Sequence, residues 1–343
     1  MIASKAIRYH KAGDPLRVLQ LDTINVNTKL EPTQVLIRWL MAPVNPLDIN
    51  RIQGAYVLKN EYPQIAGSEG VGKIVKVGSG VDGLKVGDKV IGGAPVTSTW
   101  TEFGVSFQDG LQVIHPNVDL VSAATLKINP PTAYIMLKEY EDLAPGDYVI
   151  QNSANSAVGR CVIQQAKAFG LKTVNIVRER PNVEELKKEL IALGADFVFT
   201  EEEFKNDGRK FVKSLDRPIK LACNGVGGRS ALAISAVLGY GRTCVTYGGM
   251  SMKPSEFSTS SLLFNDLKAV GVAVTSFVTN PKNEKKVKNM FNELQDLILS
   301  GQLTPPPAKI HPLSDFKQAL RDHLDGRKGK QMLLIGDEAS AKL

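Results

Sequence analysis

The chain has 343 residues, of which 43% are hydrophobic and 22% charged, which is typical of a folded globular protein with room for two cores. No apolar run approaches the roughly 18–20 residues that span a bilayer, and the three cysteines follow no C-x-x-C spacing, which argues against membrane insertion, a disulfide framework and a thiolate zinc site. The net charge of +7 indicates either a basic solvated surface or a partner rich in phosphate or carboxylate, and the lysine clusters lack the interleaved aromatics of a nucleic-acid platform.

The first third of the chain is dense in short β-branched segments that end at glycine or proline. Residues 34–44, 70–78 and 87–93 are the clearest of these segments, and few helical periods separate them. We therefore expect an irregular β domain in this part of the chain.

Strands alternate with helices from about residue 122 onward. The strand-like segment 147–152 precedes an amphipathic helix over 157–169, and the strand 172–177 precedes a helix for which Asn182 and Glu185 form a capping-box pattern. Such alternation is typical of an α/β fold with a parallel sheet. We therefore expect a doubly wound nucleotide-binding half.

After about residue 275 a lysine-rich helix, a proline-rich turn and a final strand follow. Because the strands of the β-rich first third need partners, we expect this tail to return to them. The predicted domains are a discontinuous catalytic domain over 1–124 and 275–343, and a Rossmann dinucleotide-binding domain over 125–274.

The loop between the first strand and helix of the nucleotide-binding half is NSANSAVG, residues 152–159, where such proteins normally carry G-x-G-x-x-G. Gly159 keeps the position at which the helix packs closely on the strand, and Asn155 and Ser156 add side-chain donors that suit a phosphate or a ribose. An ordinary loop before an ordinary helix is the alternative, because a broken motif is weak evidence.

The second strand of this half is followed by Arg178, Glu179 and Arg180, about where an NAD enzyme carries an acidic residue for the ribose hydroxyls. Guanidinium groups match a 2′-phosphate in charge and geometry, whereas the alternative is two surface arginines before a helix. We therefore expect NADPH (NADP+) as the cofactor.

The segment GSEGVGKIVKVGSGVDGLKVGDKV over 67–90, ahead of a nucleotide-binding half, resembles the medium-chain dehydrogenase/reductase superfamily. The resemblance implies a GroES-like catalytic domain. Zinc alcohol dehydrogenases of this superfamily use a cysteine and a Gly-His-Glu motif as catalytic metal ligands. Asn45 and Ser68 stand at the cysteine and histidine positions here, and the four-cysteine structural lobe is missing, so we expect no metal.

Further motifs narrow the resemblance within the superfamily: APVNPLDINRIQGAY (42–56), INPPTAY (128–134), VIQNSANSAVG (149–159), RERP (178–181), YGGM (247–250) and KGKQMLL (328–334). With these motifs the chain is most similar, nearly end to end, to mitochondrial 2-enoyl thioester reductases. This resemblance implies NADPH-dependent reduction of 2-enoyl thioesters linked to coenzyme A or acyl carrier protein, in mitochondrial fatty acid synthesis. It also implies a matrix location and a homodimer formed by edge-to-edge pairing of the nucleotide-domain sheets.

The same resemblance implies roles for single residues. Tyr56 is the expected proton donor, and Tyr62 is its competitor on the residues alone. At 272–274 the chain lacks an aromatic pair that relatives often carry, which indicates a roomier acyl pocket. The residues expected to bind the cofactor are Asn129, Asn155, Ser156, Ala157, Val158, Arg178, Glu179, Arg180, Tyr247, Gly248, Gly249, Met250, Val272, Ala273, Val274 and Lys330.

A tyrosine suits the chemistry that the resemblance implies. Hydride delivery to C3 of an enoyl thioester leaves an enolate, which needs a proton at C2. Without a metal, hydrogen-bond donors must polarise the thioester carbonyl. A tyrosine with an unperturbed pKa of about 10 stays protonated at neutral pH, yet it can protonate an enolate.

Two other functions fit parts of the sequence. A zinc-free NADPH quinone or alkenal reductase would share the fold, cofactor and hydride chemistry, but such enzymes usually keep more glycines in the loop 152–159. A non-catalytic RNA-binding protein would use the basic surface, but it would not need the cofactor-binding elements.

Overall fold

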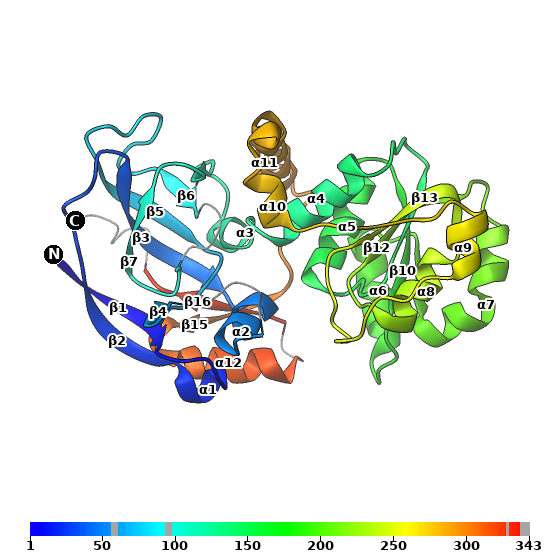
Figure 1. Ribbon diagram of the computed structural model, residues 1–343, viewed down its shortest axis with the longest axis horizontal. Coiled ribbons are helices and arrows are strands. Elements are labelled where there is room, and N and C mark those ends of the chain that lie inside the picture. The colour runs from blue at the N-terminus through cyan, green and yellow to red at the C-terminus, as the bar shows by residue number, and fades with distance from the viewer. Residues whose placement is uncertain (56–60, 93–97, 327–328, 337–343) are drawn as a thin grey trace. The chain divides into compact units, whose positions relative to one another are not determined.

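The computed structural model describes residues 1–55, 61–92, 98–326 and 329–336 (Figure 1). The chain divides into two compact units, of which the first holds Met1–Ile128 and Thr304–Leu343 and the second holds Asn129–Leu303. These bounds differ from the predicted domains in two places: residues 125–128 lie in the first unit, and residues 275–303 lie in the second. The functional division into a catalytic and a cofactor-binding domain stays a prediction. Within the described ranges, no helix is both long and apolar enough to cross a membrane.

Two sheets of described residues build the first unit (Figure 1). In the smaller sheet, β1 pairs antiparallel with β2 and with β4. The larger sheet has the order β15-β16-β3-β5-β6-β8, and β7 also pairs with β3. The tail does return to the first third, because β16 pairs antiparallel with β3 and sets Met332 opposite Pro43. The strands are β1 (Ile2–Tyr9), β2 (Gln20–Val26), β3 (Gln34–Pro43), β4 (Gln64–Ile65), β5 (Val71–Val77), β6 (Lys89–Ile91), β7 (Phe103–Phe107), β8 (Gln112–Val113), β15 (Ala308–Pro312) and β16 (Lys330–Leu334).

The core of the first unit packs two helices against these strands. Ile49 and Ile52 of α2 and Phe316 and Leu320 of α12 share one apolar cluster with the fully buried Trp100. Burying an aliphatic or aromatic side chain of this size stabilises the fold by roughly 1.5–3 kcal/mol. This packing fixes α2, the helix that leads toward Tyr56. The helical segments of this unit are α1 (Pro15–Val18), α2 (Pro46–Ile52), α3 (Leu120–Ala124), η2 (Leu313–Asp315) and α12 (Phe316–Asp325).

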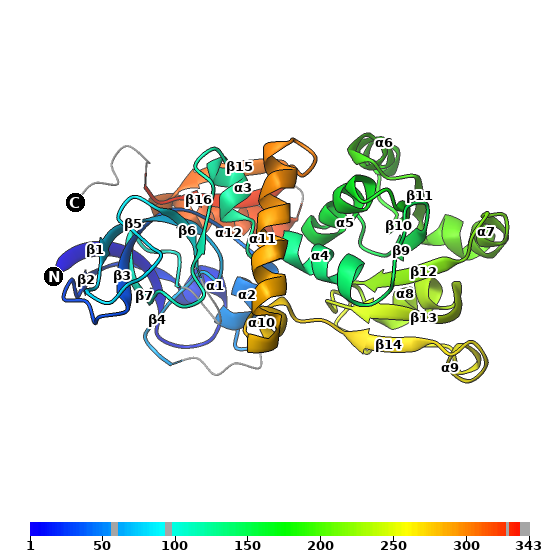
Figure 2. The same ribbon diagram turned by 90° about the horizontal axis from the view of Figure 1, so that it is seen from above.

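A parallel sheet forms the second unit, with the order β11-β10-β9-β12-β13-β14 among the described residues (Figure 2). Counted from β9, this is the Rossmann order 3-2-1-4-5-6, and such folds bind ligands beyond the carboxyl ends of the strands, where the order reverses. The predicted doubly wound fold is therefore confirmed. The strands are β9 (Tyr148–Gln151), β10 (Lys172–Val177), β11 (Phe197–Thr200), β12 (Ile219–Asn224), β13 (Leu238–Thr246) and β14 (Lys268–Gly271).

Helices supply an apolar cluster on each face of this sheet. Ile163 of α5 and Leu190 of α6 belong to one cluster, and Phe204 of α7 and Ile234 of α8 belong to the other. The helical segments of this unit are α4 (Asn129–Glu139), α5 (Ala157–Ala168), α6 (Val183–Leu193), α7 (Glu201–Lys213), α8 (Gly228–Ser235), α9 (Thr259–Phe264), α10 (Val274–Val278), η1 (Pro281–Asn283) and α11 (Glu284–Leu299).

The start of α6 differs from the prediction. Asn182 is the N-cap, but its side chain makes no capping hydrogen bond, so the predicted capping box with Glu185 is wrong. The backbone of Asn182 has φ −106° and ψ 33°, whereas an effective N-cap is extended. The capping box of this region belongs to α7 instead, where the Thr200 N–H donates to Glu203 Oε2 over 2.7 Å and the Glu203 N–H donates to Thr200 Oγ1 over 3.1 Å.

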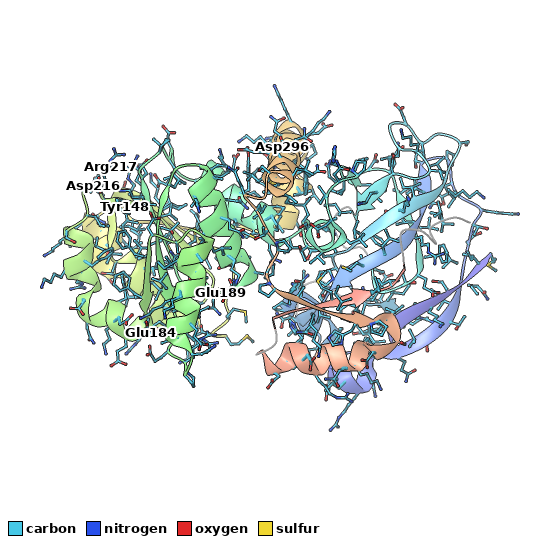
Figure 3. All side chains as sticks on the ribbon, turned by 180° about the vertical axis from the view of Figure 1, so that it is seen from behind. Tyr148, Glu184, Glu189, Asp216, Arg217 and Asp296 are labelled. Atoms are coloured by element: carbon cyan, nitrogen blue, oxygen red, sulfur yellow. The ribbon has the colours of Figure 1, made fainter. Side chains whose placement is uncertain are left out.

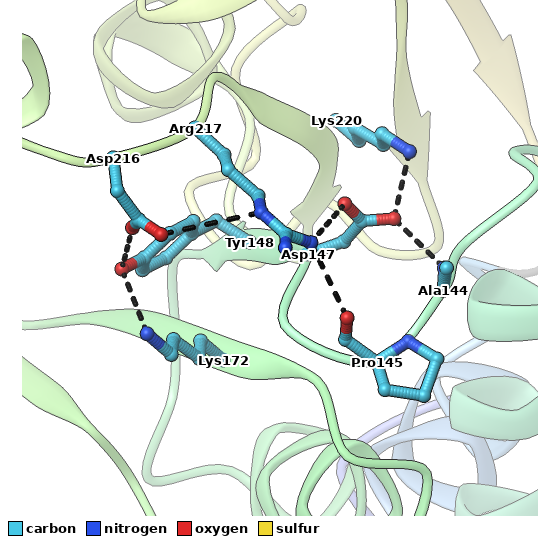
Figure 4. Close-up of polar contacts among 8 residues, drawn as sticks. All are labelled: Ala144, Pro145, Asp147, Tyr148, Lys172, Asp216, Arg217 and Lys220. Carbon is cyan, nitrogen blue, oxygen red and sulfur yellow. Dashed lines mark hydrogen bonds and ion pairs between the residues drawn. The ribbon is translucent and has the colours of Figure 1, made fainter.

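Charged side chains join the amino ends of β9 and β12 (Figure 4). Asp147 accepts a hydrogen bond from Lys220 Nζ at 2.7 Å, and Arg217 Nη1 lies 3.7 Å from the same carboxylate. Burial alone would raise the pKa of Asp147, but its hydrogen bonds and these cations hold it below its usual range. Tyr148 Oη donates to Asp216 over 2.8 Å, and Figure 3 shows Tyr148, Asp216 and Arg217 gathered at this end of the unit. These contacts stabilise the end of the sheet opposite to the expected ligand site.

Candidate active site

The loop after β9 makes a tight turn into α5. Ser153 has φ 53°, in the left-handed region, and α5 begins at Ala157. Ser156 caps this helix, because its Oγ accepts a hydrogen bond from the Gly159 N–H over 3.1 Å. A Cβ at Gly159 would lie 2.6 Å from the carbonyl oxygens of Ser153 and Ala154, which is too close for any residue but glycine. The one glycine of the variant loop is therefore required by close packing.

Residues 155–158 are half-buried where β9 ends and α5 begins. The first N–H groups of a helix have no partner within the helix and favour an anion such as a phosphate. Ser156 uses an oxygen lone pair for the cap, and its hydroxyl hydrogen can still be donated. This segment is thus suited to hold a pyrophosphate.

Three charged residues follow β10, which ends at Val177. Arg178 and Glu179 are exposed and Arg180 is half-buried. The Nε atom of Arg180 is buried and has no hydrogen-bond partner among the described residues. A buried charged donor without a partner is costly, so this guanidinium suits an anionic ligand such as a 2′-phosphate.

Tyr247 follows β13 and lies against the end of β12, since a Cβ added to Gly225 would lie 2.5 Å from Tyr247 Oη. Burial raises the pKa of this phenol, and the nearby Ser156 hydroxyl lowers it in part. No hydrogen bond of ordinary geometry joins Tyr247 Oη to a described residue. The loops after β9 and β13 therefore meet at the buried hydroxyl group of Tyr247, which has room for a further hydrogen bond. Gly248 is half-buried, and Gly249 and Met250 are exposed.

The other predicted residues of this unit lie on two further segments. The Val272 N–H donates to the Thr246 carbonyl over 3.0 Å, which places 272–274 beside the end of β13. Asn129 is the half-buried first residue of α4. The neighbouring Pro130 carbonyl accepts a hydrogen bond from Gln165 of α5 over 2.9 Å.

In the first unit, a buried polar cluster occupies the positions where the related zinc enzymes carry ligands. Asn45 Nδ2 donates to Glu69 Oε2 over 2.9 Å, and Ser68 Oγ donates to Asp48 Oδ1 over 2.7 Å. The Asn45 N–H donates to Asp48 Oδ2 over 2.8 Å at the start of α2. All four side chains are at most 4% exposed. Asn45 and Ser68 are thus both engaged in hydrogen bonds within the protein.

Lysine ammonium groups balance the two carboxylates of this cluster. Lys330 Nζ bonds Asn45 Oδ1, and Lys127 Nζ donates to the Ser68 carbonyl over 3.1 Å. Burial raises the pKa of both carboxyl groups, and Lys330 opposes that rise. Burial lowers the pKa of Lys127 to about 8. The predicted cofactor residue Lys330 is therefore anchored at its ammonium by Asn45.

Tyr56, the expected proton donor, lies outside the described residues. The chain just before it is described, and there the Ala55 N–H donates to the Asn50 carbonyl over 2.8 Å, next to the end of α2. Its competitor Tyr62 packs edge-to-face on Tyr9, with the ring centroids 5.7 Å apart. This contact gives Tyr62 a packing role, and the assignment of Tyr56 as the acid stays a prediction.

Sequence reasoning missed two asparagines at the same edge of the parallel sheet. Asn152 follows β9, Asn224 ends β12, and both side chains are fully buried. The only local signal is a polar residue directly after a buried strand, which is too common to single them out.

The comparisons with known proteins agree with this fold. Residues 31–108 match the Alcohol dehydrogenase GroES-like domain family, and residues 157–295 match the Zinc-binding dehydrogenase family. The chain is 52% identical over 340 residues to the mitochondrial enoyl-[acyl-carrier-protein] reductase of Caenorhabditis elegans, and the match covers 99% of this chain and 98% of that protein. The chain belongs to the mitochondrial enoyl-[acyl-carrier-protein] reductase family.

Two solved structures are similar to this reductase over nearly its whole length. One is the Etr1p/NADP/crotonyl-CoA complex, with a TM-score of 0.88 and 30% identity over 98% of the reductase and 100% of that chain. The other is the mitochondrial 2-enoyl thioester reductase Etr1p/Etr2p heterodimer from Candida tropicalis, with a TM-score of 0.89, 30% identity and the same coverage. The predicted superfamily, NADPH-dependent enoyl thioester reduction and mitochondrial location are thereby confirmed at the level of the family.

Proposed function

We propose that the reductase binds NADPH at the carboxyl ends of β9, β10 and β13 and uses it to reduce the C2=C3 bond of trans-2-enoyl thioesters. The observation that carries the site is a pair of buried polar atoms, Arg180 Nε and Tyr247 Oη, which make no hydrogen bond of ordinary geometry with a described residue. They follow two strands that end at the same edge of the sheet as β9. The phosphates and ribose hydroxyls of a dinucleotide would supply their partners.

NADPH supplies the hydride when it is bound. The chain must then provide a proton, and we assign that role to Tyr56. Hydride adds to C3, the C2=C3 π electrons move into an enolate, and the Tyr56 hydroxyl proton forms the new C2–H bond. The tyrosinate that remains is reprotonated from water. A phenol suits this role because an enolate is basic enough to take its proton.

We further propose that the reaction needs no metal. Asn45 stands at the cysteine position of the zinc site and already donates a hydrogen bond to Glu69. Ser68 stands at the histidine position and already donates one to Asp48. Lys330 also adds a positive charge at the Asn45 amide, which would repel a divalent cation. Among the described residues, no three His, Cys, Asp or Glu side chains form a group that could hold a metal ion.

The substrate carries its acyl group on coenzyme A or on acyl carrier protein. The solved Etr1p complex contains crotonyl-CoA, and the C. elegans relative is named for acyl carrier protein. Both carriers are acidic, and the reductase has a net charge of +7. Lys282, Lys285 and Lys288 are exposed on η1 and α11 and would attract either carrier.

We also propose that the reductase is a homodimer joined through β14. This strand is the edge of the parallel sheet, and all four of its residues are exposed (Figure 2). The helix before it, α9, buries no residue and exposes 69% of Leu263 and 79% of Phe264. An exposed edge strand with apolar neighbours pairs readily with another chain. The Etr1p/Etr2p structure is a dimer as well.

Fluorescence titration of NADPH and NADH tests the cofactor site. Arg180→Gln keeps a polar side chain but removes the charge, and it should weaken NADPH binding by about tenfold or more while NADH binding changes little. Arg217→Gln is the matched control, because Arg217 lies at the amino end of the sheet. Equal loss of affinity for both cofactors, or none in Arg180→Gln, would overturn this site.

A further inference from the structure

Two buried asparagines connect the strands at the proposed cofactor edge. Asn152, after β9, and Asn224, the last residue of β12, are both fully buried, and Asn152 Nδ2 donates to Asn224 Oδ1 over 2.8 Å. They are 72 residues apart in the sequence but lie at the carboxyl ends of two neighbouring strands. We call this pair the asparagine clamp.

The orientation of both amides in the clamp is fixed by backbone donors. The Gly225 N–H donates over 2.7 Å to Asn152 Oδ1, so the NH₂ group of Asn152 must face Asn224. The N–H groups of Val226 and Gly227 donate to Asn224 Oδ1 over 3.2 and 3.0 Å. Because a backbone N–H can only donate, these contacts identify the oxygen of each amide.

The NH₂ group of Asn224 extends the clamp to β13. It donates to Thr246 Oγ1 over 3.1 Å and to Ser255 Oγ over 3.2 Å. Hydrogen bonds therefore run in one direction from Gly225 through Asn152 and Asn224 to Thr246, across the carboxyl ends of β9, β12 and β13. Every polar atom of the two side chains has at least one partner.

The backbone of Gly225 and Val226, which the clamp holds, contacts the predicted cofactor loop 247–250. The Gly225 carbonyl accepts a hydrogen bond from the Met250 N–H over 3.2 Å, and the Val226 carbonyl accepts one from the Ser251 N–H over 2.9 Å. The Tyr247 ring lies against Gly225, where a Cβ would collide with its hydroxyl group. A shift of Gly225 and Val226 would thus move residues 247–250.

We propose that Asn152 and Asn224 are positioning residues for the dinucleotide, which hold the loops after β9, β12 and β13 in the arrangement that binds NADPH. This inference rests on the proposed cofactor site. The pair contributes no charge of its own, and this suits a support that lies beneath an anionic ligand. A carboxylate at either position would accept from the backbone donors, but it would also repel the phosphates.

Two substitutions of different severity test the clamp. Thr246→Val keeps the shape and strand preference of the residue and removes one acceptor of Asn224. Asn224→Asp keeps an oxygen toward Val226 and Gly227 but replaces the donor and adds a negative charge. Tyr148→Phe is the matched control, because it removes a partly buried hydrogen bond to Asp216 at the opposite end of the same sheet.

The NADPH dissociation constant, measured by fluorescence together with the melting temperature, is the deciding readout. Thr246→Val should weaken NADPH binding about threefold to tenfold, the effect of losing one buried hydrogen bond, and Asn224→Asp should weaken it further in low salt. In Thr246→Val, KM for NADPH should rise more than kcat falls. Tyr148→Phe should lower the melting temperature and leave the dissociation constant within about twofold.

Unchanged NADPH affinity in a folded Thr246→Val protein would overturn the proposal, even if Asn224→Asp fails to fold. An equal loss of affinity in Tyr148→Phe would also overturn it, since the effect would then be general destabilisation. A wild-type protein that binds no NADPH would instead refute the proposed cofactor site on which the inference rests.

Discussion

Asn45 Nδ2 donates a hydrogen bond to Glu69 Oε2 over 2.9 Å, and the oxygen of the same amide binds the Lys330 ammonium. The fully buried Glu69 carboxylate also accepts from the Ile128 N–H over 2.8 Å. A buried carboxylate needs this kind of support, because an unpaired one is strongly destabilising. In this reductase, the Asn45 amide and the Lys330 ammonium give that support. Asn45 stands at the position where the zinc enzymes of the superfamily carry a metal-binding cysteine.

Removal of divalent metals should leave the reductase active. After dialysis against a chelator, turnover of an enoyl thioester should stay within about 20% of the untreated enzyme, because a catalytic zinc would contribute orders of magnitude. Elemental analysis of the active sample is the control. Activity that disappears with the chelator and returns with zinc would contradict the metal-free proposal.

Tyr56→Phe should cut turnover by about 10²-fold or more, the usual effect of losing a general acid, while NADPH still binds. Tyr62→Phe is the matched control, because the ring that packs on Tyr9 is kept. Steady-state kinetics with a 2-enoyl-CoA and an NADPH titration give the two readouts. Near-normal turnover in Tyr56→Phe would remove this residue from the mechanism.

Acid should destabilise the reductase partly through His323. Burial and the nearby Lys330 lower the pKa of His323 to about 4, below the unfolded value of about 6.5. A lowered pKa means that the stabilisation is complete above pH 6.5 and is lost as the pH falls toward 4, since the unfolded chain binds the proton more tightly. The melting temperature of the wild type should therefore fall between pH 6.5 and 4 by about 5 °C more than that of His323→Gln. Parallel curves for the two proteins would argue against this role.

A charged substitution on α9 should dissociate the proposed dimer. Phe264→Glu places a carboxylate on an apolar surface beside the edge strand β14, and sedimentation should then give a monomer of about half the wild-type mass. Phe107→Glu alters an exposed phenylalanine of the first unit and should leave the mass unchanged. A wild-type monomer, or a dimer that survives Phe264→Glu, would count against pairing through β14.

The local sequence was sufficient to predict the Rossmann half and the strand, turn and helix with which it begins. Strand, loop and helix alternate with clear periods there, and Gly159 stands where the structure leaves no space for a Cβ. The position of the two arginines after β10 could also be predicted, because it follows from counting residues along the chain from the loop.

The features that escaped prediction depend on contacts between distant segments. The hydrogen bond between Asn152 and Asn224 depends on β12 lying beside β9, and the local sequence around Asn224 does not reveal that pairing. The helix 284–299 belongs by contacts to the second unit, where Tyr134 of α4 donates to Glu293 over 2.5 Å. Asn182 failed as a cap for a different reason, since the turn before α6 sets its backbone dihedrals.

The most direct test is a steady-state comparison of NADPH oxidation with a trans-2-enoyl-CoA and with a quinone under the same conditions, repeated with NADH. An NADPH-dependent enoyl thioester reductase gives a kcat/KM for the enoyl thioester with NADPH that exceeds the values for the quinone and for NADH by about tenfold or more. A quinone reduced as efficiently as the enoyl thioester, or no NADPH oxidation with any enoyl thioester, would contradict the function derived from this site.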